Sequence, residues 1–243
     1  MLFSLDHISF IAEYPEPSIH SHFAKHIIFS MEEPLQCIVE NAEFECSGLI
    51  IQSGATHTVK NVNSKMFVIL VDETCNLAKD IDSKYLNGCD YCILDGDVCK
   101  EVLTVLSANY STSDTDKELL NILKLQNNGA KEYDSRIHQV LNELSVGSLC
   151  EVDVKLLARH ACLSESRLSH LFREQVGISL SGYLVLAKMA RAYQSISNGT
   201  DITSAALNAG FSSSSHFAAT AKKNFGISTS EVTKHTNSFL GFN

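Results

Sequence analysis

One helical pattern occurs twice in this chain, first as VDVKLLARHACLSESRLSHLFREQVGIS (Val152–Ser179) and again as DITSAALNAGFSSSSHFAATAKKNFGIS (Asp201–Ser228). When the copies are aligned, Ala158 of the first matches Ala206 of the second. Each copy predicts a short helix, a tight break, a second helix and a glycine stop. This is the arrangement of a helix-turn-helix, whose second helix can lie in the major groove of DNA.

The residue types inside each copy favour this interpretation. In the first copy, Ser164 offers a hydroxyl that can cap the N-terminus of the second helix. The buried stripe of that helix has helical spacing and consists of Leu168, Leu171 and Phe172. In the second copy, Gly210 gives the turn a permissive backbone, and Ser212 or Ser213 can cap the helix that follows.

Residues 179–197, between the copies, predict one long helix with an apolar face that ends at Asn198-Gly199. A stiff connector of this kind would hold the two units at a fixed separation, so that both second helices could enter successive major grooves. After the second copy, Ser228 and Glu231 form a capping box, which predicts a short closing helix.

The pattern extends from about Leu141 to His235 and includes Ala158, Ser164, Leu168, Leu171, Phe172, Gly177, Tyr183, Lys188, Ala192, Ile202, Ala206, Gly210, Phe211, Ser215, Phe217, Phe225 and Gly226. This region resembles the DNA-binding domain of the AraC/XylS family of bacterial transcription regulators. The resemblance implies a sequence-specific regulator, an activator or a repressor, with double-stranded DNA and RNA polymerase as partners. The chain departs from the family's usual residues at Cys162 (glycine), Leu180 and Thr229 (proline), Lys188 and Ala219 (arginine) and Ala221 (phenylalanine).

The outward-facing positions of the two second helices supply the expected DNA contacts. Candidates for base contacts are Glu165, Ser166, Arg167, His170, Ser213, Ser214 and His216. Candidates for phosphate contacts are Arg173, Lys188, Lys222 and Lys223. Because the outward residues of the second copy are mostly short, we expect the first unit to carry most sequence discrimination and the second to grip mostly phosphates. The alternative is a helical bundle without a DNA function.

The two halves of the chain differ in charge. The whole chain has a formal net charge of −9, but residues 1–132 hold 9 basic and 20 acidic side chains, whereas residues 133–243 hold 10 and 8. The C-terminal half is therefore slightly basic, and its grip on DNA must come from the local placement of a few cations. We expect a modest affinity that depends strongly on salt.

A length of 243 residues suits two domains. We predict an α+β chain with a sensor and dimerisation domain over 1–126, a linker over 127–132 and an all-α DNA-binding domain over 133–243 that opens with a helix. Short apolar or alternating segments predict strands at Leu2–Ala12, Ile19–Met31, Gln36–Val39, Phe44–Ile51 and Met66–Val71. They favour a sandwich or small barrel. The AraC/XylS resemblance implies a cupin-like barrel here that binds a small-molecule effector.

Three histidines, His20, His22 and His26, have the same parity along a predicted strand, so their side chains should point to one side of the sheet. Together with the distant His57 they resemble the metal motif of cupins, where the third position is more often glutamate. Four imidazoles in the N-terminal barrel could hold a divalent metal such as zinc, nickel, iron or copper. Alternatively, these side chains line an effector pocket or a solvated strand face.

Two amphipathic helices are predicted at Asp97–Ser107 and Asp116–Gln126, between the strands and the linker. Their apolar stripes are placed where a homodimer could pair them, as the AraC/XylS resemblance implies. The alternative is that both stripes pack on their own domain.

The composition predicts a cytoplasmic protein without a membrane-spanning segment. Eight irregularly spaced cysteines are typical of free thiols in a reducing compartment. The first ten residues lack a basic leader, and no apolar run reaches the length needed to span a bilayer. Cys89, Cys92 and Cys99 could bind a metal or sense oxidation, but no further cysteine pair or nearby histidine completes a ligand set.

Sequence motifs of common enzyme classes are missing from the chain, including a glycine-rich phosphate loop, a nucleophile elbow and a His-Glu-x-x-His helix. Two alternatives to a DNA-binding regulator remain open. One is a metal-dependent cupin enzyme or sensor built on the four histidines. The other is a protein-interaction module with weakened DNA binding. We expect a transcription regulator and no catalytic activity.

Overall fold

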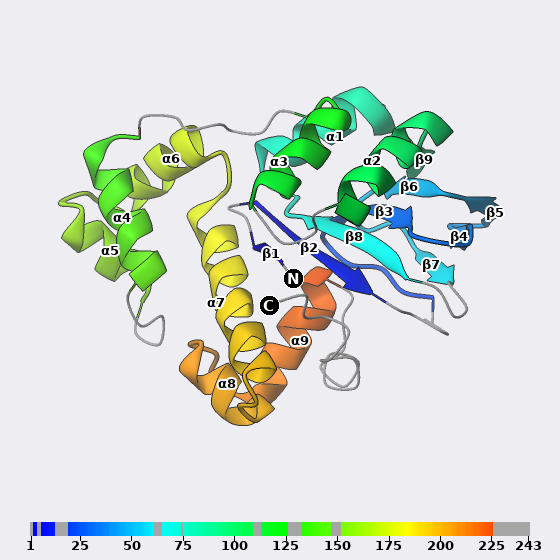
Figure 1. Ribbon diagram of the computed structural model, residues 1–243. Coiled ribbons are helices and arrows are strands. Elements are labelled where there is room, and N and C mark those ends of the chain that lie inside the picture. The colour runs from blue at the N-terminus through cyan, green and yellow to red at the C-terminus, as the bar shows by residue number, and fades with distance from the viewer. Residues whose placement is uncertain are drawn as a thin grey trace.

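The computed structural model describes residues 2–3, 6–12, 19–60, 65–73, 75–108, 113–125, 133–146 and 152–225. Strands and a few helices make up the N-terminal part, and helices alone make up the C-terminal part (Figure 1). The expected mixed α+β architecture is therefore confirmed. The predicted linker and the predicted closing helix at Ser228 and Glu231 lie outside the described residues.

The larger N-terminal sheet is antiparallel and has the order β1 (Leu2–Phe3), β2 (His7–Ala12), β8 (Met66–Val71), β3 (Lys25–Ser30), β6 (Gly48–Ile51) and β9 (Tyr91–Ile93). In its centre, Ile27 pairs with Ile50 on one side and Ile69 on the other. Every residue of β3 and β8 is buried. Central strands with both faces covered read as continuous apolar runs, and this pattern made β8 easy to predict.

A smaller sheet has the order β5 (Ala42–Cys46), β4 (Leu35–Val39) and β7 (His57–Lys60). Along β4, Leu35, Cys37 and Val39 are buried and Gln36 is exposed, as expected for a strand with one face on the core. The described strands form two separate sheets and do not close into the expected barrel. The predicted strand Phe44–Ile51 is in fact two strands, because the chain leaves the smaller sheet and enters the larger one at Ser47.

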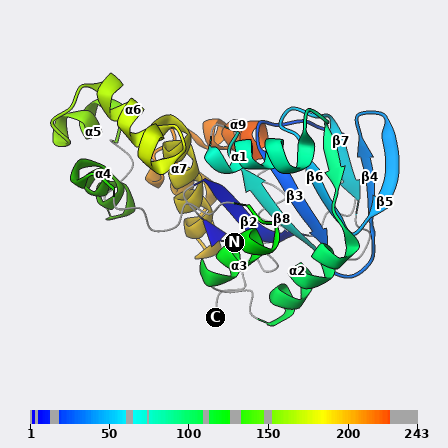
Figure 2. The ribbon, with the colours of Figure 1, turned by 90° about the horizontal axis from the view of Figure 1, so that it is seen from above.

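The N-terminal helices lie beside the larger sheet (Figures 1 and 2). They are α1 (Asn76–Ile81), continued by one wide turn η1 (Asp82–Leu86), then α2 (Gly96–Ala108) and α3 (Ser113–Ile122). The apolar stripes considered for dimerisation are packed inside this one chain, since Val102, Leu106, Leu119, Leu120 and Leu123 are buried. These stripes therefore pack on their own domain.

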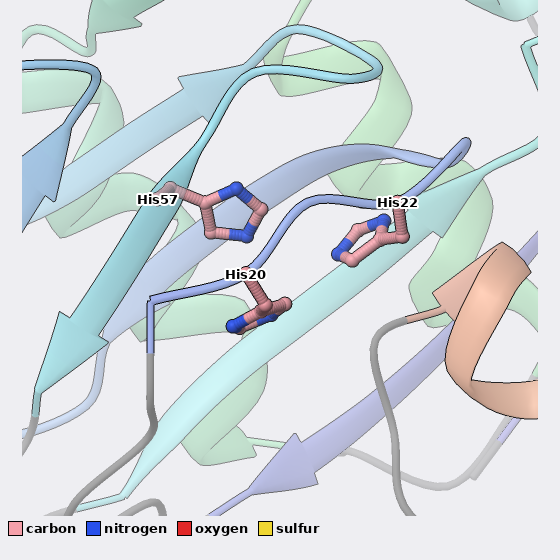
Figure 3. Close-up of side chains that lie close together, drawn as sticks. All are labelled: His20, His22 and His57. Atoms are coloured by element: carbon pink, nitrogen blue, oxygen red, sulfur yellow. The ribbon is translucent and has the colours of Figure 1, made fainter.

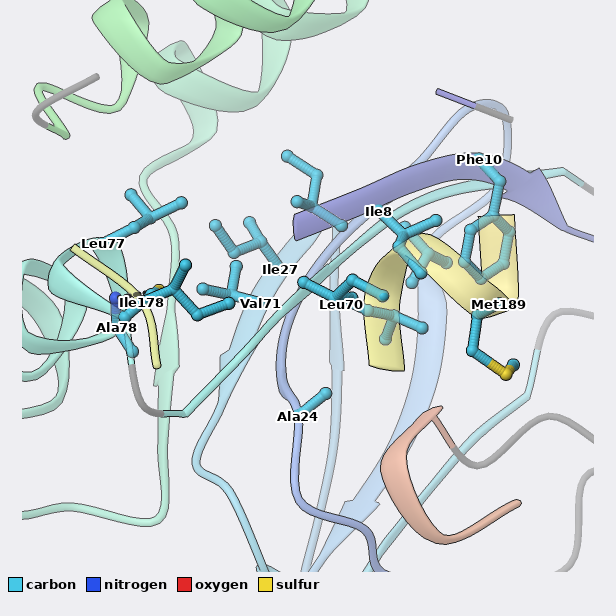
Figure 4. Packing of buried hydrophobic residues seen from close by; sticks show 14 of the residues in the cluster. Ile8, Phe10, Ala24, Ile27, Leu70, Val71, Leu77, Ala78, Ile178 and Met189 are labelled. Carbon is cyan, nitrogen blue, oxygen red and sulfur yellow. Dashed lines mark hydrogen bonds between the residues drawn. The ribbon is translucent and has the colours of Figure 1, made fainter. Parts of the chain in front are cut away.

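The C-terminal helices are α4 (Ser135–Val146), α5 (Val154–His160), α6 (Glu165–Val176), α7 (Leu180–Ser197), α8 (Ile202–Asn208) and α9 (Ser214–Phe225). They share a hydrophobic core with the N-terminal domain: Ile178, just before α7, and Met189 of α7 belong to the same buried cluster as Ile8, Phe10 and Val71 (Figure 4). Among the described helices, none is both long and apolar enough to cross a bilayer.

Candidate nucleic-acid interface and histidine cluster

The first unit consists of α5 and α6, and side-chain caps fix where each helix begins. The Asp153 carboxylate accepts a hydrogen bond from the Leu156 amide at 2.7 Å, which starts α5. The Ser164 hydroxyl accepts one from the Arg167 amide at 3.2 Å, which starts α6. Such caps satisfy amides that have no partner within the helix. The predicted capping role of Ser164 is confirmed.

The two faces of α6 have different environments, and the sequence pattern predicted them correctly. Leu168, Leu171 and Phe172 are buried. All five predicted DNA-contacting residues of this unit are exposed: Glu165, Ser166, Arg167, His170 and Arg173. The helix thus offers solvent a continuous polar face with two guanidinium groups.

The second unit consists of α8 and α9 and is built in the same way. Asp201 caps α8 by accepting from the Ser204 amide at 3.0 Å. The Ser213 hydroxyl accepts from the His216 amide at 3.0 Å, so Ser213 is the residue that caps α9. The imidazole of His216 also lies 2.9 Å, Nδ1 to Oγ, from Ser212. Two of the predicted base-contacting residues here, Ser213 and His216, are therefore exposed but already have local partners.

The long helix α7 joins the two units, and its Lys188 side chain is hydrogen-bonded within the protein. Its ammonium donates to the carbonyl of Gly210 at 3.0 Å, in the turn of the second unit, and the residue is half-buried. This bond links α7 to the turn between α8 and α9. A phosphate contact by Lys188 stays a prediction, whereas Lys222 and Lys223 are exposed on the last turn of α9.

The C-terminal end of α9 contacts the N-terminal domain at Phe23. The Phe23 amide donates to the carbonyl of Lys223 at 3.2 Å. The Lys223 ammonium in turn lies 5.1 Å from the centre of the Phe23 ring, within the range of a cation–π interaction. This contact could not be predicted from the sequence, because it joins residues that are distant in the chain and neither has a local pattern that marks it.

His20, His22 and His57 come together between the two sheets, and we call them the histidine cluster (Figure 3). Each offers one ring nitrogen, and these three atoms lie within 4.8 Å of one another. His20 forms an isolated antiparallel bridge with His57 of β7, with backbone N–O distances of 3.0 and 2.8 Å. His20 and His22 precede β3 rather than belonging to it, so the predicted parity along one strand does not apply to them.

His26 of β3, the fourth predicted ligand, is outside this group of three but packs beside it. Its ring centre lies 4.2 Å from that of His22 and 4.8 Å from that of His57. It is buried. His26 lies on the larger sheet and His57 on the smaller sheet, so ring contacts at the cluster join the two sheets.

Burial favours the neutral form of His22, His57 and the neighbouring His26. Burial lowers the pKa of His22 to about 3, with repulsion from His57 and His20 adding to the effect and a backbone interaction at Ala24 weakly opposing it. Burial likewise lowers the pKa of His57 to about 4, and the pKa of His26 lies well below its usual range for the same reason. Neutral imidazole is the form that binds metal ions.

Hydrogen bonding leaves ligand atoms available in the cluster. Nδ1 of His57 lies 2.8 Å from the Ala55 carbonyl oxygen, which can only accept, so this nitrogen carries the proton and Nε2 keeps a lone pair. Neither ring nitrogen of the buried His22 has a hydrogen-bond partner among the described residues. Cys89, Cys92 and Cys99, also considered as ligands, do not join a metal-competent group within the described part of the chain.

The whole chain shares its fold with solved structures of ToxT from Vibrio cholerae. The TM-score is 0.52 against the apo form of a ToxT variant from strain SCE256, at 7% identity, covering 98% of this chain and 99% of that one. It is 0.50 against ToxT from strain O395, at 10% identity, covering 97% and 98%. At such identities the likeness concerns the fold alone.

The helix-turn-helix region also matches at the level of sequence. Residues 157–235 match a family described as a helix-turn-helix domain. Over 80 residues the chain is 39% identical to the arabinose operon regulatory proteins of Salmonella typhimurium (strain LT2) and Escherichia coli (strain K12). The C-terminal region of the chain is thus a helix-turn-helix domain similar in sequence to that of these arabinose operon regulators. The match covers 32% of this chain and 28% and 27% of those proteins, so the chain spans under a third of the length of these curated relatives.

Two departures from the usual residues of the AraC/XylS family now have a structural meaning. Cys162 has a φ of 54°, a left-handed conformation that glycine adopts more easily, and Gly210 at the matching place of the second unit has a φ of 90°. Ala221 is fully buried on the inner side of α9, one turn after Phe217, whose ring lies 5.5 Å from Tyr193 and 5.2 Å from Phe211. These rings occupy the core next to the position where the family usually has a phenylalanine.

Proposed function

We propose that this protein is a sequence-specific DNA-binding transcription regulator of the AraC/XylS type, controlled by a signal that its N-terminal domain receives. One observation carries the proposal: two N-capped helices, α6 and α9, belong to units joined by the α7 connector and carry exposed polar residues. The 18 residues of α7 make a rod of roughly 27 Å. This length is comparable to one turn of B-DNA, about 34 Å.

The shared core supports control by the N-terminal domain. Met189 of α7 and Phe10 of β2 belong to one buried cluster, so a change in the sheet can alter the position of the connector. Phe23 contacts α9 itself. A signal that binds one arrangement of these contacts more tightly would shift the population of DNA-competent molecules.

The finer features of the regulator belong to the same proposal. We infer a cupin-like sensor made of two facing sheets, since the rings of His26 and His57, on different sheets, are in contact. A small molecule or ion is the expected effector, RNA polymerase the expected protein partner and the cytoplasm the expected location. A homodimer would have to use surfaces other than the α2 and α3 stripes, which are buried within the chain.

Selection of duplexes from a randomised pool by the full chain, followed by fluorescence anisotropy, tests the proposal. We expect the selected duplex to bind at least about a hundredfold more tightly than a scrambled duplex, and both affinities to fall steeply as salt rises. Equal binding of the two duplexes at every salt concentration would refute sequence-specific regulation. It would favour an interaction module that no longer reads DNA.

A further inference from the structure

We propose that the histidine cluster binds a divalent first-row transition metal ion, and that this ion strengthens the hold of the N-terminal domain on α9. The regulatory half of this inference rests on the proposed DNA-binding function. The metal-binding half stands on the geometry of His20, His22 and His57 alone.

The composition of the cluster selects the chemical class of ligand. Three imidazoles suit zinc, copper, nickel or iron, whereas calcium and magnesium prefer oxygen atoms. Zinc–nitrogen bonds of about 2.0–2.1 Å place ligating nitrogens roughly 3.3–3.5 Å apart. The three nitrogens already lie within 4.8 Å, so a closure of at most about 1.5 Å completes the site.

The environment of these side chains also fits a metal. A buried polar atom without a partner costs free energy, and both ring nitrogens of His22 are in this state within the described structure. The Nδ1–H group of His57 donates a hydrogen bond to the Ala55 carbonyl, which leaves Nε2 for a metal. Hydrogen bonds of this kind orient metal-binding histidines. Three protein ligands leave a coordination position open, and the half-buried His20 gives access from solvent. An exchangeable ion, suited to a signal, is expected at such a site.

The segment that carries two of the ligands also carries the contact with α9. Phe23 directly follows His22, and its amide bonds the last turn of α9. Just beyond it, the buried Lys25 makes ion pairs with Glu73 at 2.9 Å and Asp82 at 3.0 Å, so the chain is anchored on that side. An ion bound by His20, His22 and His57 would fix the chain on the N-terminal side of Phe23. The backbone would then be anchored both before and after Phe23.

The contact between Phe23 and Lys223 determines whether the metal raises or lowers the affinity for DNA. Lys223 is a predicted phosphate contact, but in this arrangement its ammonium lies over the Phe23 ring. Phe23 and a DNA phosphate therefore compete for the same side chain. Because the ligand atoms are nearly gathered while Phe23 contacts α9, the metal should favour this arrangement and weaken DNA binding. By linkage, DNA should weaken metal binding by the same factor.

Metal binding is tested on the chelator-treated full chain by titration with Co²⁺, which reports imidazole ligation through its visible absorption bands. We expect one equivalent to bind and Zn²⁺ to displace it. His20→Ala should lower the affinity by at least about tenfold, and the exposed His138→Ala, outside the cluster, should match wild type. Circular dichroism of His20→Ala checks that the variant is folded. Failure to bind one equivalent, or equal affinities of wild type and folded His20→Ala, would overturn the site.

The coupling is tested by anisotropy with a duplex selected by the metal-free protein, with and without Zn²⁺. Zn²⁺ should lower the DNA affinity about tenfold, within the usual range of allosteric coupling. Phe23→Ala should still bind one Co²⁺ but lose this effect. An unchanged or raised DNA affinity with Zn²⁺ would overturn the coupling. If no duplex is bound selectively while Co²⁺ still binds, the proposed DNA function fails and the metal site stands.

Discussion

The two helix-turn-helix units are copies of one pattern, yet their second helices are in different situations. α6 has an exposed face with Glu165, Arg167 and Arg173. α9 presents mostly short side chains, and its last turn is bonded to Phe23 of the N-terminal domain. From this comparison we expect the first unit to recognise the base sequence. We expect the second unit to contact DNA phosphates only when the contact between Phe23 and Lys223 is released.

The aromatic packing on the buried sides of α6 and α9 also differs. Phe172 under α6 makes a ring contact with Tyr183 at 5.5 Å. Phe217 under α9 contacts two rings, those of Tyr193 and Phe211. The second unit also buries several alanines: Ala205, Ala206, Ala209 and Ala221. Small residues let its helices approach closely, and Phe217, Tyr193 and Phe211 are the large side chains whose rings meet in this core.

The largest expected effect follows from this packing. Phe217→Ala should destabilise the C-terminal domain by about 3–5 kcal/mol, because it removes a fully buried ring and leaves a cavity. The matched change Phe172→Ala should fall at the lower end of that range, since one ring contact is lost rather than two. Chemical denaturation followed by circular dichroism gives both values. A clearly greater loss for Phe172→Ala would contradict the importance given to the two ring contacts of Phe217.

The next effect concerns which unit reads bases. Arg167→Ala should cost about 1–3 kcal/mol of discrimination between the selected duplex and a duplex changed at one base pair, because a guanidinium can donate two hydrogen bonds to a guanine. His216→Ala should cost less, since this imidazole already bonds Ser212. Anisotropy with matched and mismatched duplexes measures both. Equal losses of discrimination in the two variants would show that both units read sequence.

The turns offer a smaller and purely conformational test. Gly210→Ala should destabilise the protein by about 0.5–1 kcal/mol, because the cost of about 1–2 kcal/mol for a side chain at positive φ exceeds the glycine entropy of about 0.5–1 kcal/mol that the change removes. Cys162→Gly should do the opposite, because it removes a similar strain and costs about 0.5–1 kcal/mol of glycine entropy. A net gain of roughly 0.5–1 kcal/mol is expected. A destabilised Cys162→Gly variant would indicate that the Cys162 side chain makes a contact worth more than the strain.

Features set by nearby residues could be predicted from the sequence. The caps at Ser164 and Ser213, the buried stripe around Leu168 and the extent of α7 all follow from patterns within one or two helical turns. The strand β8 was predicted with the correct ends for the same reason, since its apolar run is continuous. Local physical chemistry was sufficient for the second helices and their exposed faces.

Features set by distant pairing could not be predicted. The strand β7 is short and defined by its partner β4, so it has no pattern of its own. The split between β5 and β6 depends on which sheet each half joins. The bridge between His20 and His57 and the contact between Phe23 and Lys223 join residues distant in sequence, and they arise only when the chain folds.

The smallest effect distinguishes two neighbouring lysines on α9. Lys222→Ala should weaken binding to all duplexes alike and reduce the slope of log affinity against log salt by about 0.9, as expected for one lost phosphate contact. Lys223→Ala should cost less affinity, because wild-type Lys223 must first leave the Phe23 ring before it can reach a phosphate. In a Phe23→Ala background this difference should vanish, and the two lysine changes should then be equivalent. Anisotropy at four salt concentrations gives the slopes. If Lys223→Ala is the more costly change in both backgrounds, Phe23 does not compete with DNA for this side chain.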